Sequence, residues 1–464
     1  MKKYIYPKKI INEKPEWLNL LKRQELQIGL SESVTSKFQD GEYLILDFGV
    51  ELCGGIRILT YKAKNVPIRV RFGESLTECC SELGGDKNAT NDHSLRDFSL
   101  HLQNYSDTSF GRSGFRFARL DFYGDVEIKS IVAESRIAKK KVRYEYKGDD
   151  LLVKKIYECA KRTIDLCIES GYVLDGIKRD RLVWVGDLHP ETLALTTLYN
   201  RAKELEKSLD FVKNQTPLPS WMNGIPMYSM WWIIVIADYY QRTGARDFAV
   251  KQIDYLNALL QQMDLCIKEN GELNYPFYFV DWPTHNQPDE ILGARAINII
   301  AIKKAIDLLT EFGQSTRLAT KLLDRLQKVP ILPTQSKQVT ALKYLALGYL
   351  SEEDKQNLLK GGAKGLSTFM SYYILKAIAS FDKEQAVKIM KEYYGAMLDK
   401  GATTFWEDFD VEWGNKSCRI DEFPKDNQKD IHGDFGDYCY KGFRHSLCHG
   451  WSAGVIAFME EEKI

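Results

Sequence analysis

The densest group of chemically useful side chains lies in the stretch DGIKRDRLVWVGD, which begins at Asp175. Its acids are Asp175, Asp180 and Asp187, and Arg179 and Trp184 lie between them. An N-cap aspartate with surface ion pairs is the simpler interpretation. Acids and arginines interleaved with an apolar Leu-Val-Trp run favour a binding site instead. A carboxyl held beside other carboxyls and an apolar ring has its pKa raised, as a general acid requires.

A second acidic stretch, GATTFWEDFDVEW, spans residues 401–413. Glu407 follows Trp406 directly, and three further acids crowd the same stretch. Acid clusters in loops are usually solvated. Here, however, Phe405 and Trp406 would hold Glu407 in a partly apolar wall, which suits a positioned general base.

Two histidines, His445 and His449, stand four residues apart in HSLCHGWSAGV, which we predict to begin a helix. Such a pair could bind a metal, but no Glu-x-x-His partner or cysteine accompanies it. We therefore expect no metal and no cofactor. His449 and the nearby Trp451 are interpreted as contacts to a ligand's hydroxyl groups or as satisfied core residues.

Tryptophans give a further signal, because eight of the nine lie beyond position 180 and several adjoin an acid. A sugar ring stacks its C–H face on such rings while its hydroxyls take hydrogen bonds, although large aromatics also fill large cores. In YFVDWPTHNQPDE, Asp281 and Trp282 could supply a hydroxyl contact and a stacking platform. The segment Asn91–His93 could reach the same site or simply cap a turn.

Composition excludes several classes of protein. Lysine plus arginine equals aspartate plus glutamate at 64 each, so the basic surface of a nucleic-acid binder is not expected. The nine cysteines form no Cys-x-x-Cys pair, and no stretch approaches the ~20 apolar residues of a membrane span. The N-terminus lacks the apolar core of a signal peptide. We expect a cytoplasmic protein, or a periplasmic or secreted one if a leader was removed, and a monomer or homodimer.

The elements that must position these residues fall into two kinds. After an N-terminal segment, 1–39, the pattern has a period of two up to about residue 137, which predicts an antiparallel β-sandwich module over 40–147. Over 148–464 the period is helical, with about twelve segments and no short sequence repeat. The prediction is a mainly α chain, with an (α/α)6 barrel preceded by the sandwich.

The motifs also resemble those of a known family. The run from Asp175 to Asp187 resembles the signature of the bacterial α-L-rhamnosidases of glycoside hydrolase family 78. GATTFWE looks like that family's second catalytic motif, and SLCHGWSAGV resembles its closing His-containing helix. The segments LDFGVELCGGIRI and RFGES are similar to the family's preceding β module. Where the family commonly has Arg-Asp-Glu-Arg, this chain has Arg179-Asp180-Arg181.

The resemblance implies an inverting glycoside hydrolase that releases a terminal sugar, α-L-rhamnose above all, from a glycoside or oligosaccharide. It implies that Asp180 is the general acid and Glu407 the general base. The implied sugar contacts are Asp175, Arg179, Trp184, Asp187, Asp281, Trp282, Trp406, His449 and Trp451. Alternatives are a barrel glycosidase of another specificity, a lyase, or an inactive sugar-binding protein.

Overall fold

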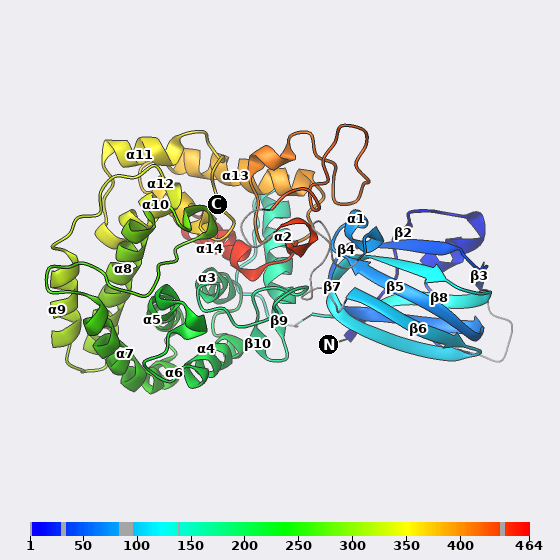
Figure 1. Cartoon of the computed structure of the whole chain (residues 1–464), viewed down its shortest axis with the longest axis horizontal. Coiled ribbons are helices and arrows are strands. Elements are labelled where there is room, and N and C mark those ends of the chain that lie inside the picture. The colour runs from blue at the N-terminus through cyan, green and yellow to red at the C-terminus, as the bar shows by residue number, and fades with distance from the viewer. Residues whose placement is uncertain (1, 29–33, 83–95, 138–139, 437–440) are drawn as a thin grey trace.

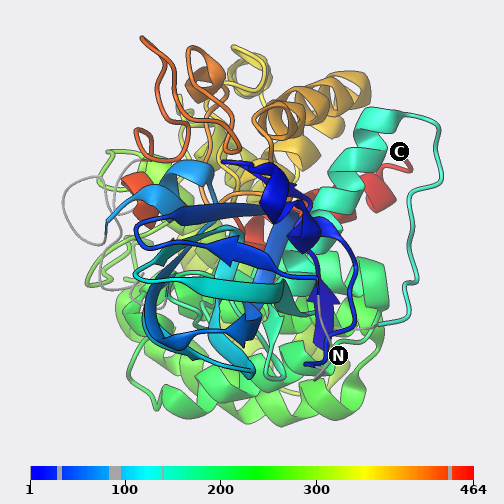
Figure 2. The ribbon, with the colours of Figure 1, turned by 90° about the vertical axis from the view of Figure 1, so that its right-hand side faces the viewer.

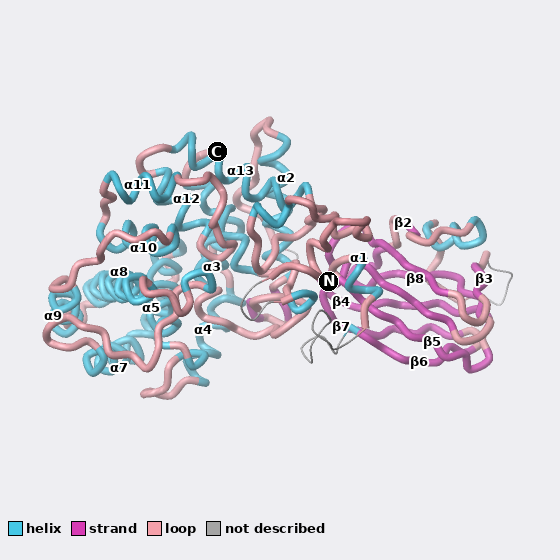
Figure 3. Tube along the Cα trace, turned by 45° about the horizontal axis from the view of Figure 1, so that its top comes forward, coloured by secondary structure: helices cyan, strands magenta, loops and turns pink. Residues whose placement is uncertain are grey.

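The structure is a computed structural model that describes residues 2–28, 34–82, 96–137, 140–436 and 441–464. Asn91, Asp92 and His93 lie outside the described residues. Figure 1 shows a β module beside a ring of helices, and Figure 2, turned by 90°, places the module in front of that ring. The tube in Figure 3 shows the division: strands gather at one end and helices at the other.

The β module is an antiparallel sheet with the strand order β1-β8-β4-β7-β5-β6. Its bounds are β1 Lys2–Ile5, β2 Lys9–Ile10, β3 Ser36–Phe38, β4 Tyr43–Lys62, β5 Lys64–Gly73, β6 Asp97–Gln103, β7 Ser106–Phe122 and β8 Val126–Arg136. The register of β4 against β7 shifts after Asp47 and again after Gly54, and such bulges bend long strands. The bent strands enclose one apolar core, as a sandwich does.

The N-terminal segment differs from the sequence-based prediction. It does not precede the module as a separate piece, because β1 and β3 pair with β8 and β2 pairs with β4. A short 3-10 helix, Pro15–Leu21, packs Trp17 and Leu20 into the same core. Strands of two to four residues are too short to show a period of two, so the sequence pattern did not reveal them.

The helical domain alternates inner and outer helices. The inner ones are α3 Leu188–Tyr199, α5 Pro226–Thr243, α8 Glu290–Glu311, α10 Lys337–Leu347, α12 Ser371–Ala379 and α14 Val455–Glu461. Each packs on the next, and α14 returns to α3, so the ring is closed. The outer ones are α2 Leu151–Leu166, α4 Lys203–Gln215, α7 Ile253–Cys266, α9 Arg317–Leu326, α11 Glu352–Leu359 and α13 Lys383–Asp399. The described residues therefore form the predicted barrel behind a β-sandwich.

Burial explains which helices are inner. In α5 every residue from Pro226 to Ala237 is buried, as expected for a helix that is apolar on all sides. In α4 only one face is buried, through Leu205, Leu209 and Val212, while Lys203 and Lys207 are exposed. Short elements complete the helical domain: α6 Arg246–Ala249 and the strand pair β9 Ile168–Glu169 with β10 Tyr172–Val173. The short helix α1, Leu76–Cys80, belongs to the β module, where it follows β5.

The final helix begins later than predicted. Residues 445–449 are not its first turn, because the helix α14 starts at Val455 after a 3-10 turn over Gly450–Gly454. His449 instead has extended backbone angles and forms an antiparallel bridge with Gly176. His445 and His449 therefore do not share a helix face. No helix within the described ranges is both long and apolar enough to cross a membrane.

Candidate active site

A pocket of about 300 Å³ opens at one end of the helical ring. Its lining residues come from segments that lead from an outer helix to the next inner one: α2 to α3, α4 to α5, α7 to α8 and α13 to α14. Loops of one direction open on one face of an alternating barrel, which explains why residues so distant in sequence meet here. The acidic stretches of the sequence analysis supply two of these four loops.

Backbone pairing fixes three loop segments against one another at the pocket floor. Glu407 N–H donates to the Ser446 carbonyl at 2.9 Å, and His449 N–H donates to the Phe405 carbonyl at 3.0 Å. On the other side, Gly450 N–H donates to the Asp175 carbonyl at 2.7 Å. The loop that begins at residue 445 thus lies between the two acidic loops and holds them in register.

Glu407 is the most heavily paired carboxylate of the pocket. One oxygen, Oε1, contacts Arg179 Nη2 and lies 3.4 Å from His449 Nε2. The other, Oε2, accepts a hydrogen bond from Ser446 N–H at 2.9 Å. Burial favours the neutral acid, but Arg179 and His449 outweigh it and hold the pKa of Glu407 well below its usual range. Glu407 is therefore ionised at neutral pH.

Asp175 and Asp187 have the opposite electrostatic environment. Both are buried and lie 3.8 Å from His449 Nε2. Burial raises the pKa of Asp175 to about 7, and it also raises the pKa of Asp187 well above its usual range, against the opposing charge of His449. Burial disfavours the charged form of His449 too, yet Glu407, Asp187 and Asp175 together raise its pKa.

Asp180 is the pocket acid that solvent reaches most easily, with 23% of its side chain exposed. Its Oδ1 lies 3.0 Å from Arg179 Nη1, so Asp180 and Glu407 contact different nitrogens of one guanidinium. Asp180 and Arg181 both have positive φ angles, 51° and 57°. Two successive non-glycine residues in this region are strained, and such strain persists where the surroundings require the geometry.

Aromatic rings line the pocket beside the acids. Trp184, Tyr228, Phe277, Phe279, Trp282 and Trp451 all line the pocket. Trp282 packs edge-on against Phe279 with ring centroids 5.0 Å apart, and Trp184 packs edge-on against Tyr228 at 6.1 Å. Phe277 is 40% exposed at the rim. The pocket therefore combines apolar faces with a carboxylate floor.

Two predicted ligand contacts need correction. Asp281 and Trp406 are buried and do not line the pocket. Asp281 caps the short 3-10 helix Trp282–Thr284 and accepts a hydrogen bond from Ser367 Oγ. Trp406 packs edge-on against Phe409 and His445. Both residues pack behind the pocket wall. In each motif one side chain lines the pocket and the adjacent side chain is buried in the core.

The other predicted residues line the pocket: Asp175, Arg179, Asp180, Trp184, Asp187, Trp282, Glu407, His449 and Trp451. Sequence reasoning missed Tyr228, Phe277, Phe279, His285 and Arg444. Phe277 and His285 flank the predicted Asp281-Trp282 pair, so loop membership could have indicated them. Tyr228 lies within an apolar helix, where an aromatic residue carries no specific signal.

Comparison with solved structures finds this architecture in rhamnosidases. The rhamnosidase from Klebsiella oxytoca, solved with rhamnose bound, gives a TM-score of 0.73 at 19% identity, covering 92% of this chain and 89% of that one. The GH78 family rhamnosidase of Bacillus sp. GL1 gives 0.72 at 19% identity, covering 97% and 48%. The Streptomyces avermitilis α-L-rhamnosidase, complexed with L-rhamnose, gives 0.67 at 17%, covering 90% and 42%.

The chain spans about half the length or less of the Bacillus and Streptomyces proteins and most of the Klebsiella one. No sequence-family profile matches the chain, and no curated protein does. At these identities the likeness establishes architecture. The chain therefore has the fold of the α-L-rhamnosidases, as the resemblance implied.

Proposed function

We propose that the pocket is the active site of an inverting glycoside hydrolase that releases a terminal α-L-rhamnose from a glycoside or oligosaccharide. Two of the structures that share the fold hold rhamnose, which favours a 6-deoxyhexose as the sugar. The volume of about 300 Å³ is at the small end of ligand pockets and suits one monosaccharide. The remainder of the substrate would leave through the rim near Phe277.

The observation that carries the proposal is the contrast between acids in one small pocket. Glu407 is held ionised by Arg179 and His449, whereas burial raises the pKa of Asp175 to about 7 and the pKa of Asp187 well above its usual range. Carboxyls whose surroundings separate their pKa values are the usual means by which an enzyme supplies both a base and hydrogen-bond donors. The hydroxyl groups of a sugar can donate hydrogen bonds to an ionised carboxylate and accept them from a protonated carboxyl group.

In the proposed reaction, Glu407 takes a proton from a water molecule whose oxygen attacks the anomeric carbon. The bond from that carbon to the glycosidic oxygen breaks, and protonated Asp180 donates its proton to the departing oxygen. Inversion requires the two carboxyls to stand roughly 6.5–9.5 Å apart, so that the water fits between Glu407 and the sugar. Asp180 suits the acid role because its side chain reaches solvent and can recover a proton after each turnover.

In this proposal Asp175, Asp187 and His449 bind the hydroxyls of the sugar, and the rings of Trp184, Trp282 and Trp451 contact its apolar face. Arg179 keeps Glu407 charged and competes with the substrate for Asp180. In this proposal the glycosidic oxygen lies beside Asp180.

A panel of nitrophenyl glycosides tests the proposal. We expect release of nitrophenol from the α-L-rhamnoside at a kcat/KM at least tenfold above that for the L-fucoside and D-mannoside. Proton NMR of the first product should show the β anomer, which then mutarotates. Preferred cleavage of another sugar would overturn the specificity, and first appearance of the α anomer would overturn inversion. Rhamnose binding in calorimetry without hydrolysis of any glycoside would overturn catalysis.

A further inference from the structure

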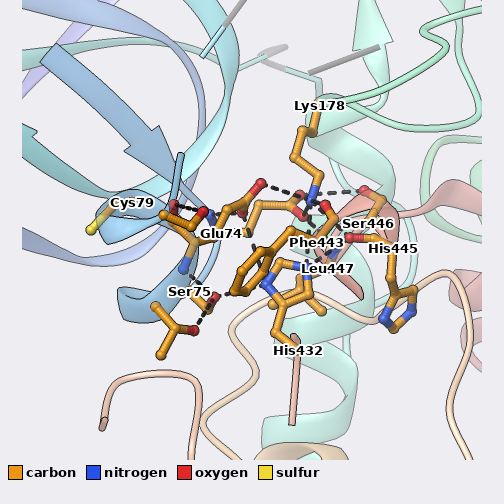
Figure 4. A network of polar contacts seen from close by, with 12 residues as sticks. Glu74, Ser75, Cys79, Lys178, His432, Phe443, His445, Ser446 and Leu447 are labelled. Atoms are coloured by element: carbon orange, nitrogen blue, oxygen red, sulfur yellow. Dashed lines mark hydrogen bonds and ion pairs between the residues drawn. The ribbon is translucent and has the colours of Figure 1, made fainter. Parts of the chain in front are cut away.

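A second cluster of charged residues lies buried where the β module meets the helical domain. It consists of Glu74, Glu78, Lys178 and His432, and we call it the Lys178 cluster (Figure 4). Glu74 and Glu78 come from the β module, around the start of α1. Lys178 directly precedes Arg179 of the pocket, and all four side chains are 2% exposed or less.

The Lys178 ammonium is at the centre of the cluster. Its Nζ lies 2.9 Å from Glu74 Oε2 and 3.2 Å from Glu78 Oε1. It also donates to the Phe443 carbonyl at 2.9 Å and the His445 carbonyl at 2.7 Å. One side chain thereby joins the β module, the loop that carries Arg179 and the loop that leads to His449.

The arrangement is that of a metal site filled by an amine. Glu74, Glu78 and His432 bring their ligand atoms within 4.8 Å of one another, close enough to hold an ion. The Lys178 Nζ already contacts both carboxylates and lies 3.5 Å from His432 Nε2. Because the Lys178 Nζ contacts the same three side chains, we treat the cluster as a structural joint between the segments that carry them.

The cluster connects to Glu407 through two paths. In the first, Glu74 Oε2 accepts from Leu447 N–H at 2.6 Å, and the adjacent Ser446 N–H donates to Glu407 Oε2 at 2.9 Å. In the second, Lys178 is joined by one peptide bond to Arg179, whose guanidinium contacts Glu407 Oε1. Both oxygens of Glu407 are thus held by groups that Lys178 and Glu74 position.

We propose that Lys178, together with Glu74 of the β module, is a positioning residue for Glu407, so that the β module completes the active site. The inference rests on the proposed function insofar as Glu407 is the general base. It does not need the identity of the sugar. Neither Lys178 nor Glu74 lines the pocket, so both act through Arg179 and the loop at Ser446.

The expected change concerns the charge of Glu407. The titratable groups that face it are Arg179, His449, Asp187 and the buried His445. Arg179 and His449 lower the pKa of Glu407, and Asp187 opposes them. His445 takes no proton, because its Nε2 accepts from Asp408 N–H and burial lowers its pKa. Loss of the Lys178 joint would loosen Arg179 and the Ser446 N–H, and the pKa of Glu407 would rise.

The test compares Lys178→Met with Lys343→Met. Lys343 is a matched control, since it is buried and pairs with buried Asp354 at 2.8 Å on another part of the barrel. The carboxyl ¹³C resonance of Glu407, assigned by its absence in Glu407→Gln, reports the charge directly. In wild type and Lys343→Met it should remain that of a carboxylate down to the ordinary glutamate pKa of about 4.3. In Lys178→Met it should titrate at or above that pH.

Activity supplies the second readout. For Lys178→Met we expect kcat to fall at least tenfold with KM changed less than threefold, and the acid limb of the pH–rate profile to move to higher pH. Lys343→Met should lower the melting temperature and leave that profile in place. If Lys178→Met does not fold, Glu74→Gln takes its place. Its amide oxygen can still accept from Leu447 N–H, while the carboxylate that pairs with Lys178 is lost.

The outcomes separate this inference from the proposed function. A folded Lys178→Met or Glu74→Gln with an unshifted Glu407 titration and a kcat within twofold of wild type would overturn the positioning role. If wild type hydrolyses no glycoside, the proposed function fails, and the ¹³C titration still decides whether Lys178 sets the charge of Glu407.

Discussion

Two groups of buried acids lie on either side of the same loops, and their partners differ. In the Lys178 cluster, one ammonium and the backbone N–H of Leu447 face the carboxylates. In the pocket, Asp175 and Asp187 both lie 3.8 Å from His449 Nε2. Asp175 also accepts from Leu182 N–H at 2.7 Å and Asp187 from the Tyr228 hydroxyl at 3.5 Å, yet burial still raises the pKa of both. Beneath them, neither carboxyl oxygen of buried Glu191 has a hydrogen-bond partner among the described residues.

The difference indicates what each group is for. A buried acid with a complete set of partners fixes a geometry, as the Lys178 cluster does for the junction of the two modules. Buried acids without enough partners cost stability and are retained where a ligand uses them. Substitutions of the pocket acids should therefore change the catalytic rate. They should also change how the free energy of unfolding depends on pH, and more so than substitutions elsewhere in the protein.

The largest effect expected from the pocket is that of Glu407→Gln. The amide keeps the shape and can accept from Ser446 N–H, but it cannot take a proton from water. We expect kcat to fall by ~10² to 10⁴-fold, the usual contribution of a general base. Initial rates on the preferred nitrophenyl glycoside would measure it.

The matched control is Glu412→Gln, the same change in the same loop at an exposed side chain paired with Lys364. Its rate should stay within twofold of wild type. If kcat of Glu407→Gln falls less than tenfold, Glu407 is not the general base. The contrast between the pocket acids and the Lys178 cluster would then have no link to catalysis.

A smaller and more selective effect is expected from Asp180→Asn. An enzyme without its general acid fails mainly on poor leaving groups, so we expect a loss of about 10²-fold on an alkyl rhamnoside and less than tenfold on a dinitrophenyl one. Asp187→Asn should reduce both rates alike, because in our proposal Asp187 binds the sugar. A plot of rate against leaving-group pKa distinguishes them, and a steep dependence for Asp187→Asn alone would transfer the acid role to Asp187.

The sequence predicted the barrel well because long amphipathic helices leave a clear period. The helical period over 148–464 indicated about twelve segments, and the described ring has six inner and six outer helices. The prediction that a helix begins at His445 was wrong, because the bridge between Gly176 and His449 keeps that segment extended. A pairing between residues so far apart in sequence leaves no local signal.

Part of the site could also be predicted from the sequence. Acids beside arginines in one stretch indicated Asp180 and Asp187, and their loops meet as the alternating barrel requires. The sequence does not show which way a single side chain points. The prediction therefore placed Trp406 in the pocket, although it is buried behind Glu407. Lys178 was not predicted as a site residue. Its partners Glu74 and Glu78 lie about a hundred residues earlier in the chain, so the residues next to Lys178 give no sign of them.

The smallest effect concerns stability and tests the electrostatic contrast itself. The folded pKa of Asp175 is about 7, raised by burial from the ordinary value of 3.8. Between those values the unfolded chain has released the proton and the folded one has kept it. Stability that Asp175 contributes below its unfolded pKa is therefore lost as pH rises towards 7, by at most about 1.4 kcal/mol per pH unit.

Asn cannot ionise, so Asp175→Asn should gain stability relative to wild type as pH rises from 5 to about 7 and then level off. Urea unfolding at each pH measures this difference. Asp354→Asn is the control, because its interactions lower the pKa of Asp354 and confine its titration to more acidic solution. That variant should be less stable by a constant amount over the same interval. If the stability difference between Asp175→Asn and wild type is also constant over this interval, Asp175 is ionised throughout it. The partners of Asp175 would then offset the cost of burying its charge.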